Sequence, residues 1–194
     1  MKNFEILDRL FSSKLRIKLL DVFLSSPNAR FYIRELERKI KEEAKNVSRE
    51  LKNLEGLGLL ISEKQGNLKY YSVNENFFLY PELKAIIFKT TGVQGLLKEA
   101  LERLKGIETA FIYGTYATGK ESESSDVDIM VIGKPDLTEL NEVISNLEEK
   151  LNREINYMCF GQEEFKERRK AGDAFINEVL SGEKIMLKGT ERAI

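Results

Sequence analysis

The fold of the second half of the chain is decided by residues 109–133, TAFIYGTYATGKESESSDVDIMVIG. The apolar run 109–113 predicts a buried strand, and the small residues from Gly114 to Gly119 predict a sharp turn after it. A second apolar run, which starts at Asp126 with two acidic residues at alternate positions, predicts another strand. The stretch therefore indicates a strand, a glycine turn and an acidic strand.

The two acidic residues, Asp126 and Asp128, are suited to binding divalent cations. Side chains two apart on a strand point to the same face, roughly 6 to 7 Å apart along the chain, so two carboxylates can hold one or two Mg²⁺ ions. Ions held in this way can bridge the oxygens of a triphosphate. In the preceding turn, Gly114 permits close approach of the backbone, and the Thr115 hydroxyl can donate a hydrogen bond to a phosphate. An isolated Asp-x-Asp pair is more often two solvated carboxylates at the start of a strand. The glycine turn before the pair is therefore what makes the pattern more specific for a metal site.

The combination of residues 114–119, GTYATG, with residues 125–128, SDVD, resembles the DNA polymerase beta-like nucleotidyltransferase superfamily, particularly the minimal nucleotidyltransferases of archaea and bacteria. The resemblance implies a mixed sheet flanked by helices. It also implies that Gly114 and Thr115 contact nucleotide phosphates and that the two aspartates bind the metal. Thr115 stands where the family has Ser and keeps the hydroxyl.

Two further positions depart from the family's pattern. Thr118 stands where many minimal members have Arg, and the nearby Lys120 is a candidate to replace that phosphate contact. The superfamily also uses a third carboxylate on a later strand, and the matching position here is Asn156. Because an amide cannot accept a proton from an attacking hydroxyl, this departure argues against catalysis. Glu154, on the same strand face, is the alternative catalytic carboxylate or else a surface charge.

The first half of the chain predicts three short helices and a hairpin. Apolar residues repeat at helical spacing within residues 12–25, 33–40 and 44–55, and strand-like runs follow at 59–61 and 70–73. This is the order of a winged helix-turn-helix, whose third helix enters the major groove of duplex DNA while the hairpin touches the backbone. The predicted DNA contacts lie on the outer face of the third helix and beside the hairpin turn: Lys45, Asn46, Ser48, Arg49, Lys52, Lys64 and Lys69.

Residues 31–36, 47–59 and 70–74 resemble prokaryotic transcriptional regulators of the ArsR-like winged-helix type. The resemblance implies a homodimer whose two recognition helices bind a near-palindromic site. The metal-sensing residues of that group do not carry over, because this half of the chain contains no His and no Cys. Winged helices also serve as protein–protein modules, and that alternative stays open.

Charge divides the chain into two different halves. Residues 1–90 contain 17 Lys and Arg and 12 Asp and Glu, a net charge of +5, whereas residues 91–194 contain 14 and 20, a net charge of −6. A basic half favours a polyanionic partner, although chance asymmetry among surface charges would give the same counts. With no His and one Cys in the whole chain, a His base, an internal disulfide and a Cys/His zinc site are excluded.

The sequence therefore predicts an α+β protein with a winged helix-turn-helix domain and connecting helix at 1–90 and a minimal nucleotidyltransferase domain at 91–194. No apolar run approaches the roughly 20 residues of a membrane span, and the N-terminus has no signal-peptide pattern, which favours the cytoplasm. The preferred function is a dimeric, DNA-binding transcriptional regulator whose second domain binds a nucleoside triphosphate with Mg²⁺. The alternative is an enzyme that transfers a nucleoside monophosphate to a protein or small-molecule hydroxyl, similar to minimal nucleotidyltransferases that act as antitoxins on HEPN-domain toxins.

Overall fold

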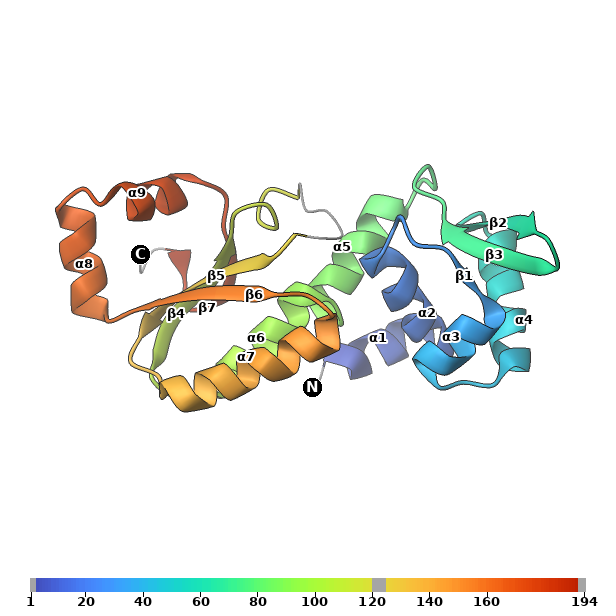
Figure 1. The fold of residues 1–194 in the computed structure, drawn as a ribbon, viewed down its shortest axis with the longest axis horizontal. Coiled ribbons are helices and arrows are strands. Elements are labelled where there is room, and N and C mark those ends of the chain that lie inside the picture. The colour runs from blue at the N-terminus through green and yellow to red at the C-terminus, as the bar shows by residue number, and fades with distance from the viewer. Residues whose placement is uncertain (1–2, 120–124, 192–194) are drawn as a thin grey trace. The chain divides into compact units, whose positions relative to one another are not determined.

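The computed structural model describes residues 3–119 and 125–191, and the chain divides into two compact units (Figure 1). Unit 1 is Met1–Gly92 and unit 2 is Val93–Ile194. Within the described residues, every helix is too short or too polar to cross a lipid bilayer.

Unit 1 combines helices with a three-stranded antiparallel sheet, in the strand order β1-β3-β2. Its elements are α1 (Asn3–Phe11), α2 (Lys14–Ser25), β1 (Phe31–Tyr32), α3 (Ile33–Ile40), α4 (Ala44–Gly56), β2 (Leu60–Gln65), β3 (Leu68–Val73) and α5 (Tyr80–Thr90). The three helices and the hairpin expected from apolar spacing are present as α2, α3, α4 and β2-β3. The sequence did not predict α1, in which Leu7 is the buried residue.

The core of unit 1 is formed by the apolar stripes of its helices and by the inner face of the sheet. Ile17 of α2, Leu36 of α3 and Leu51 of α4 are completely buried, and Tyr71 of β3 packs in the same cluster. Val47 and Leu54 bury the same side of α4. The opposite side of α4 is therefore left for polar residues.

Unit 2 is built on a four-stranded mixed sheet in the order β6-β5-β4-β7, with β5 and β6 parallel and the other pairs antiparallel. Its elements are α6 (Val93–Arg103), β4 (Ile107–Tyr113), β5 (Val127–Gly133), α7 (Leu137–Leu151), β6 (Ile155–Phe160), α8 (Gln162–Lys170), α9 (Ala174–Ser181) and β7 (Ile185–Lys188). A mixed sheet with flanking helices agrees with the predicted α+β class.

One face of this sheet packs against α8 and α9 (Figure 1). Phe111 of β4 and Met130 of β5 are fully buried there with Phe165 of α8 and Ile176 of α9. Because side chains alternate along a strand, Asp128 shares the face of Met130, at the end of β5 where the helices leave it half-buried. The fold thus places an acidic residue at one end of an otherwise apolar strand.

Candidate functional site

Strand pairing brings three predicted site residues of unit 2 together. Asp128 lies in β5 directly opposite Asn156 of β6, and Asp126 precedes β5 by one residue. The Asn156 Nδ2 donates a hydrogen bond of 3.4 Å to Asp126 Oδ2. Asn156 therefore stands beside both aspartates, at the position where the resemblance implies a third carboxylate.

Glu154, the alternative third carboxylate, is exposed and lies one residue before β6. Its main-chain oxygen accepts a hydrogen bond of 2.9 Å from Val127 N, which starts the pairing of the two strands. Glu154 is thus next to the aspartates along the sheet, but the residue hydrogen-bonded to Asp126 is Asn156.

The glycine turn lies against the Asp128 carboxylate. Tyr113, the last residue of β4, is paired with Asp128, so Gly114 follows at the same end of the sheet. Gly114 has φ of +71°, and a Cβ atom added there would lie 2.8 Å from Asp128 Oδ2. Any residue larger than Gly would therefore strain the backbone and displace the carboxylate.

Thr115 and Thr118 occupy the turn itself. Thr115 is exposed, and its main-chain oxygen accepts a hydrogen bond of 3.1 Å from the Thr118 hydroxyl. The Thr118 N–H donates to Gly114 O at 3.3 Å. The Thr118 side chain therefore closes the turn, and Thr115 stays exposed within it. Lys120, the other predicted phosphate contact, lies outside the described residues.

The electrostatics of the site favour a bound cation. Burial raises the pKa of Asp128, and the negative charge of Asp126 raises it further, while a hydrogen bond from Asn156 lowers it. Burial also raises the pKa of Tyr113, and the charge of Asp128 adds to that rise. Two carboxylates that repel each other form a donor pair suited to a hard divalent cation.

The rest of the coordination would have to come from elsewhere. Among the described residues, no three Asp, Glu, Cys or His side chains gather closely enough to hold a metal ion by themselves. The two aspartates nevertheless fit an ion that completes its shell with phosphate oxygens and water, as Mg²⁺ commonly does.

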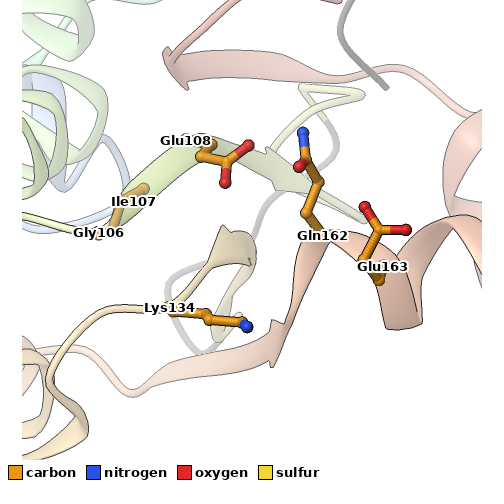
Figure 2. Close-up of a pocket in the computed structure, with 6 residues that line it drawn as sticks. All are labelled: Gly106, Ile107, Glu108, Lys134, Gln162 and Glu163. Atoms are coloured by element: carbon orange, nitrogen blue, oxygen red, sulfur yellow. The ribbon is translucent and has the colours of Figure 1, made fainter.

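A separate cavity of about 440 Å³ lies at the other end of β5 (Figure 2). Figure 2 shows the side chains of Glu108, Gln162 and Glu163 around it with Lys134, the residue after β5. Lys134 lies six positions after Asp128 along the chain, which is about 20 Å in a strand. The cavity is therefore distinct from the aspartate site.

In unit 1, the predicted DNA contacts of α4 form one polar face. Lys45, Arg49 and Lys52 are exposed, whereas Asn46 and Ser48 are half-buried. The three cations lie opposite the buried Val47, Leu51 and Leu54 stripe, at helical spacing. The structure thus aligns them along the outer side of the helix.

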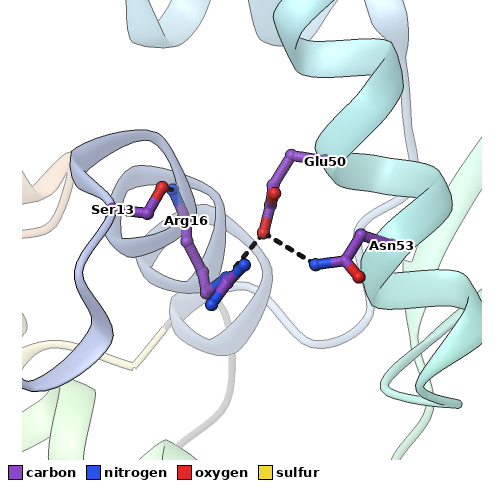
Figure 3. Close-up of polar contacts among 4 residues, drawn as sticks. All are labelled: Ser13, Arg16, Glu50 and Asn53. Carbon is purple, nitrogen blue, oxygen red and sulfur yellow. Dashed lines mark hydrogen bonds and ion pairs between the residues drawn. The ribbon is translucent and has the colours of Figure 1, made fainter.

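A polar cluster fixes α4 against α2 (Figure 3). Glu50 Oε1 accepts hydrogen bonds from Arg16 Nε at 2.6 Å and from Asn53 Nδ2 at 3.3 Å. Ser13, the N-cap of α2, accepts a hydrogen bond from the Arg16 N–H. The Glu50 carboxylate of α4 is therefore paired with Arg16 and Asn53 rather than with the exposed cations of the same helix.

The two hairpin lysines differ in their surroundings, although Lys64 and Lys69 are opposite each other in register. Lys69 Nζ lies 2.8 Å from Glu55 Oε2 and 4.9 Å from the centroid of the Tyr71 ring. The hydrogen bond from Lys69 lowers the pKa of Glu55, as does a second bond from Ser62. The charge of Lys69 is therefore largely offset within unit 1.

Sequence reasoning missed Tyr113, Tyr116 and Arg153 beside the aspartates. The Arg153 guanidinium carbon lies 5.6 Å from the centroid of the Tyr116 ring, and Arg153 Nη1 donates a hydrogen bond of 3.2 Å to Ser125 O. Tyr113 was visible only as the last residue of an apolar strand. No sequence pattern around Arg153 indicated its contacts, because its partners Ser125 and Tyr116 are 28 and 37 positions earlier in the chain.

Comparison with known proteins places a family match in unit 2. Residues 96–190 match the family model "Polymerase beta, Nucleotidyltransferase". No curated protein matches the chain. Among solved structures, the chain is similar to a toxin–antitoxin complex with AMP-PNP, at 19% identity and a TM-score of 0.37 over 51% of this chain and 75% of that one. It is also similar to the Shewanella oneidensis complex of a tri-AMPylated HEPN toxin with the MNT antitoxin, at 17% identity and a TM-score of 0.33 over 52% and 76%.

Proposed function

We propose, from the premise that residues 96–190 form a polymerase beta-like nucleotidyltransferase domain, that unit 2 binds a nucleoside triphosphate together with Mg²⁺. The observation that carries this proposal is the position of Asp128 beside Gly114, two residues after Asp126 at the same end of β5. The first unit would bind duplex DNA, so that the protein is a transcriptional regulator whose DNA binding responds to nucleotide.

In this proposal each site residue of unit 2 has one role. Asp126 and Asp128 would hold Mg²⁺, which neutralises phosphate charge when bound. The Thr115 hydroxyl and the turn amides would donate hydrogen bonds to the triphosphate, and Gly114 would keep the backbone close to Asp128. Lys120 would add a phosphate contact.

Titration calorimetry with Mg²⁺ and each of the four nucleoside triphosphates tests the proposed binding of triphosphate by unit 2. Asp128→Asn should reduce triphosphate affinity at least a hundredfold, because it removes one of two cation ligands. Glu149→Gln, on the exposed side of α7, removes an equal charge and should bind like the wild type. Absence of heat with every triphosphate, or equal affinity in Asp128→Asn, would refute nucleotide binding at this site.

The DNA-binding role of unit 1 rests on its element order and on its charge. Along the chain, helices α3 and α4 are followed by the β2-β3 hairpin, and this order of elements is typical of a winged helix-turn-helix. In this role α4 would enter the major groove with Lys45, Asn46, Ser48, Arg49 and Lys52, and the hairpin lysines Lys64 and Lys69 would approach the backbone. The protein would act as a homodimer in the cytoplasm and bind two half-sites.

Binding of the intact protein to a pool of random duplex DNA at low salt tests the proposed DNA binding of unit 1. Neutralising phosphates releases counterions, so the affinity should fall steeply as salt rises. Sedimentation of the complex would show two protomers per duplex. If the intact protein does not bind duplex DNA at low salt, unit 1 has another partner.

The second candidate function is transfer of a nucleoside monophosphate, which the family match itself favours. The acceptor hydroxyl oxygen would bond to the α-phosphorus as the bond to pyrophosphate breaks, and Glu154 would take the hydroxyl proton. The acceptor would be a hydroxyl on a HEPN-like toxin or on a small molecule. Asn156 weakens this candidate, because it occupies the position beside the aspartates and accepts no proton.

Incubation with α-labelled triphosphates and Mg²⁺ separates the two functions. Label on a candidate toxin or small molecule, lost in both Asp128→Asn and Glu154→Gln, would establish transfer. Tight binding of triphosphate without release of pyrophosphate would leave nucleotide sensing as the function of unit 2.

A further inference from the structure

The glycine turn and the aspartate segment of unit 2 are brought together by a side chain from a third part of the chain. Of the residues that the structure describes, the turn covers Gly114 to Gly119 and the aspartate segment covers Ser125 and Asp126. Arg153, which follows the end of α7, contacts both: its guanidinium carbon lies over the Tyr116 ring of the turn, 5.6 Å from the ring centroid, and its Nη1 donates to the carbonyl oxygen of Ser125. Ser125 directly precedes the cation ligand Asp126.

The position of Arg153 is itself fixed by its backbone. Asn152 adopts a left-handed conformation, with φ of +52°, and ends α7. The Arg153 N–H donates to Glu148 O at 3.2 Å, and the Glu148 carboxylate accepts from Ile155 N at 2.8 Å. Glu148 therefore holds the chain on both sides of Arg153 in place before any ligand binds.

The chemistry of the guanidinium suits it to joining two segments. Its planar face stacks on an aromatic ring while its N–H groups, which lie in the same plane, donate to an oxygen at the edge. An ammonium on a flexible stem lacks that face and the fixed direction of its donors. The buried Tyr116, with 5% of its surface exposed, gives the guanidinium a rigid platform.

We infer that Arg153 is a positioning residue of the nucleotide site, which sets the distance between the phosphate-binding turn and the aspartates. This inference rests on the proposed nucleotide binding and adds the means by which the site is pre-organised. Asp126 and Asp128 repel each other, so the segment that carries them needs a stabilising contact that leaves their carboxylates available for a cation. Arg153 provides it by bonding to the main chain at Ser125 rather than to either aspartate.

Amide hydrogen exchange, measured without any ligand, tests whether Arg153 holds the turn and the aspartate segment together. The Thr118 N–H, which donates to Gly114 O, reports on the turn, and the Val127 N–H, which donates to Glu154 O, reports on how the aspartate segment is held against the start of β6. Arg153→Gln should speed exchange at both amides about tenfold, and Arg153→Lys should do nearly the same although it keeps the charge. The matched control is Lys150→Gln, an exposed residue of α7 that removes an equal charge and should leave both rates unchanged.

Calorimetry with Mg²⁺ and triphosphate on the same proteins completes the test. Arg153→Gln and Arg153→Lys should each bind about tenfold more weakly than Lys150→Gln. Wild-type exchange in Arg153→Gln, wild-type affinity despite faster exchange, or full affinity in Arg153→Lys would each overturn the positioning role. A wild-type protein that binds no triphosphate refutes the proposed function instead, and the exchange rates then decide separately whether Arg153 joins the two segments.

Discussion

In unit 1 the candidate DNA contacts Lys45, Arg49 and Lys52 are exposed side by side on one helix, whereas in unit 2 Asp126 and Asp128 are placed by strands β4, β5 and β6 together. The cations of α4 can each act through their own charge. The aspartates depend on one another, on the turn at Gly114 and on Asn156. Substitutions should therefore have graded effects in unit 1 and abrupt effects in unit 2.

Apart from the cation ligands themselves, the largest effect is expected at Gly114. Gly114→Ala should weaken triphosphate binding with Mg²⁺ about a hundredfold, because the new Cβ would lie 2.8 Å from Asp128 Oδ2 and turn the carboxylate away. It should also lower the free energy of unfolding by about 1–2 kcal/mol, since φ of +71° is strained for any residue with a Cβ. Calorimetry and urea unfolding measure the two effects.

Gly119 offers a matched control within the same turn. Its φ is +67°, but a Cβ added there meets no atom of the described residues within 4 Å. Gly119→Ala should cost the same backbone strain and leave triphosphate affinity within about threefold of the wild type. Equal losses of affinity in the two variants would mean that the turn's backbone, rather than contact with Asp128, makes the site sensitive.

A smaller and additive effect is expected on α4. Arg49→Ala with Lys52→Ala should weaken duplex DNA binding about tenfold and reduce the slope of log affinity against log salt by about 2. The control is Arg9→Ala with Lys89→Ala, which removes the same charge from exposed positions on α1 and α5. If the control loses as much affinity, the affinity for DNA depends on the net charge of unit 1 and not on a particular surface of α4.

The same contrast explains which features the sequence could predict. Strand, turn and acidic strand follow one another within residues 109–133, so local patterns were enough to predict them and the two aspartates. Asn156 was predicted only through the family resemblance, whereas Arg153, which follows α7, makes its contacts with Ser125 and Tyr116 only in the folded chain. In unit 1 the helical faces were predictable, but the ion pair of Lys69 with Glu55 spans α4 and β3 and needed the folded structure.

Removing the charge of Asp128 should stabilise the protein when no metal is bound. Burial, and then the charge of Asp126, raise the pKa of Asp128 above its ordinary value. A carboxyl group with a raised pKa in the folded state favours folding while it is protonated, and this contribution is lost as the pH rises through that pKa. Asp128→Asn should therefore unfold about 2 °C higher than the wild type at pH 7 in EDTA, a small shift because the side chain is half in water.

The pH dependence of this shift identifies its cause. Thermal unfolding followed by circular dichroism should show the advantage of Asp128→Asn disappearing as the pH falls below the ordinary range of an Asp, where Asp128 is protonated in both the folded and the unfolded state. Glu149→Gln should show no such shift. An advantage that persists at acid pH would indicate better packing by Asn rather than relief of charge repulsion between the aspartates.

The smallest effect is expected at the hairpin, where two lysines opposite each other should contribute unequally. Lys64→Ala should weaken duplex DNA binding about twofold to threefold, whereas Lys69→Ala should have less effect, because Glu55 already offsets the charge of Lys69. Glu55→Gln should then tighten DNA binding about twofold by freeing Lys69, and adding Lys69→Ala should remove that gain. An equal loss in the two lysine variants would mean that Lys69 leaves Glu55 when DNA binds, so that unit 1 also rearranges around its ligand rather than acting through fixed surface charges.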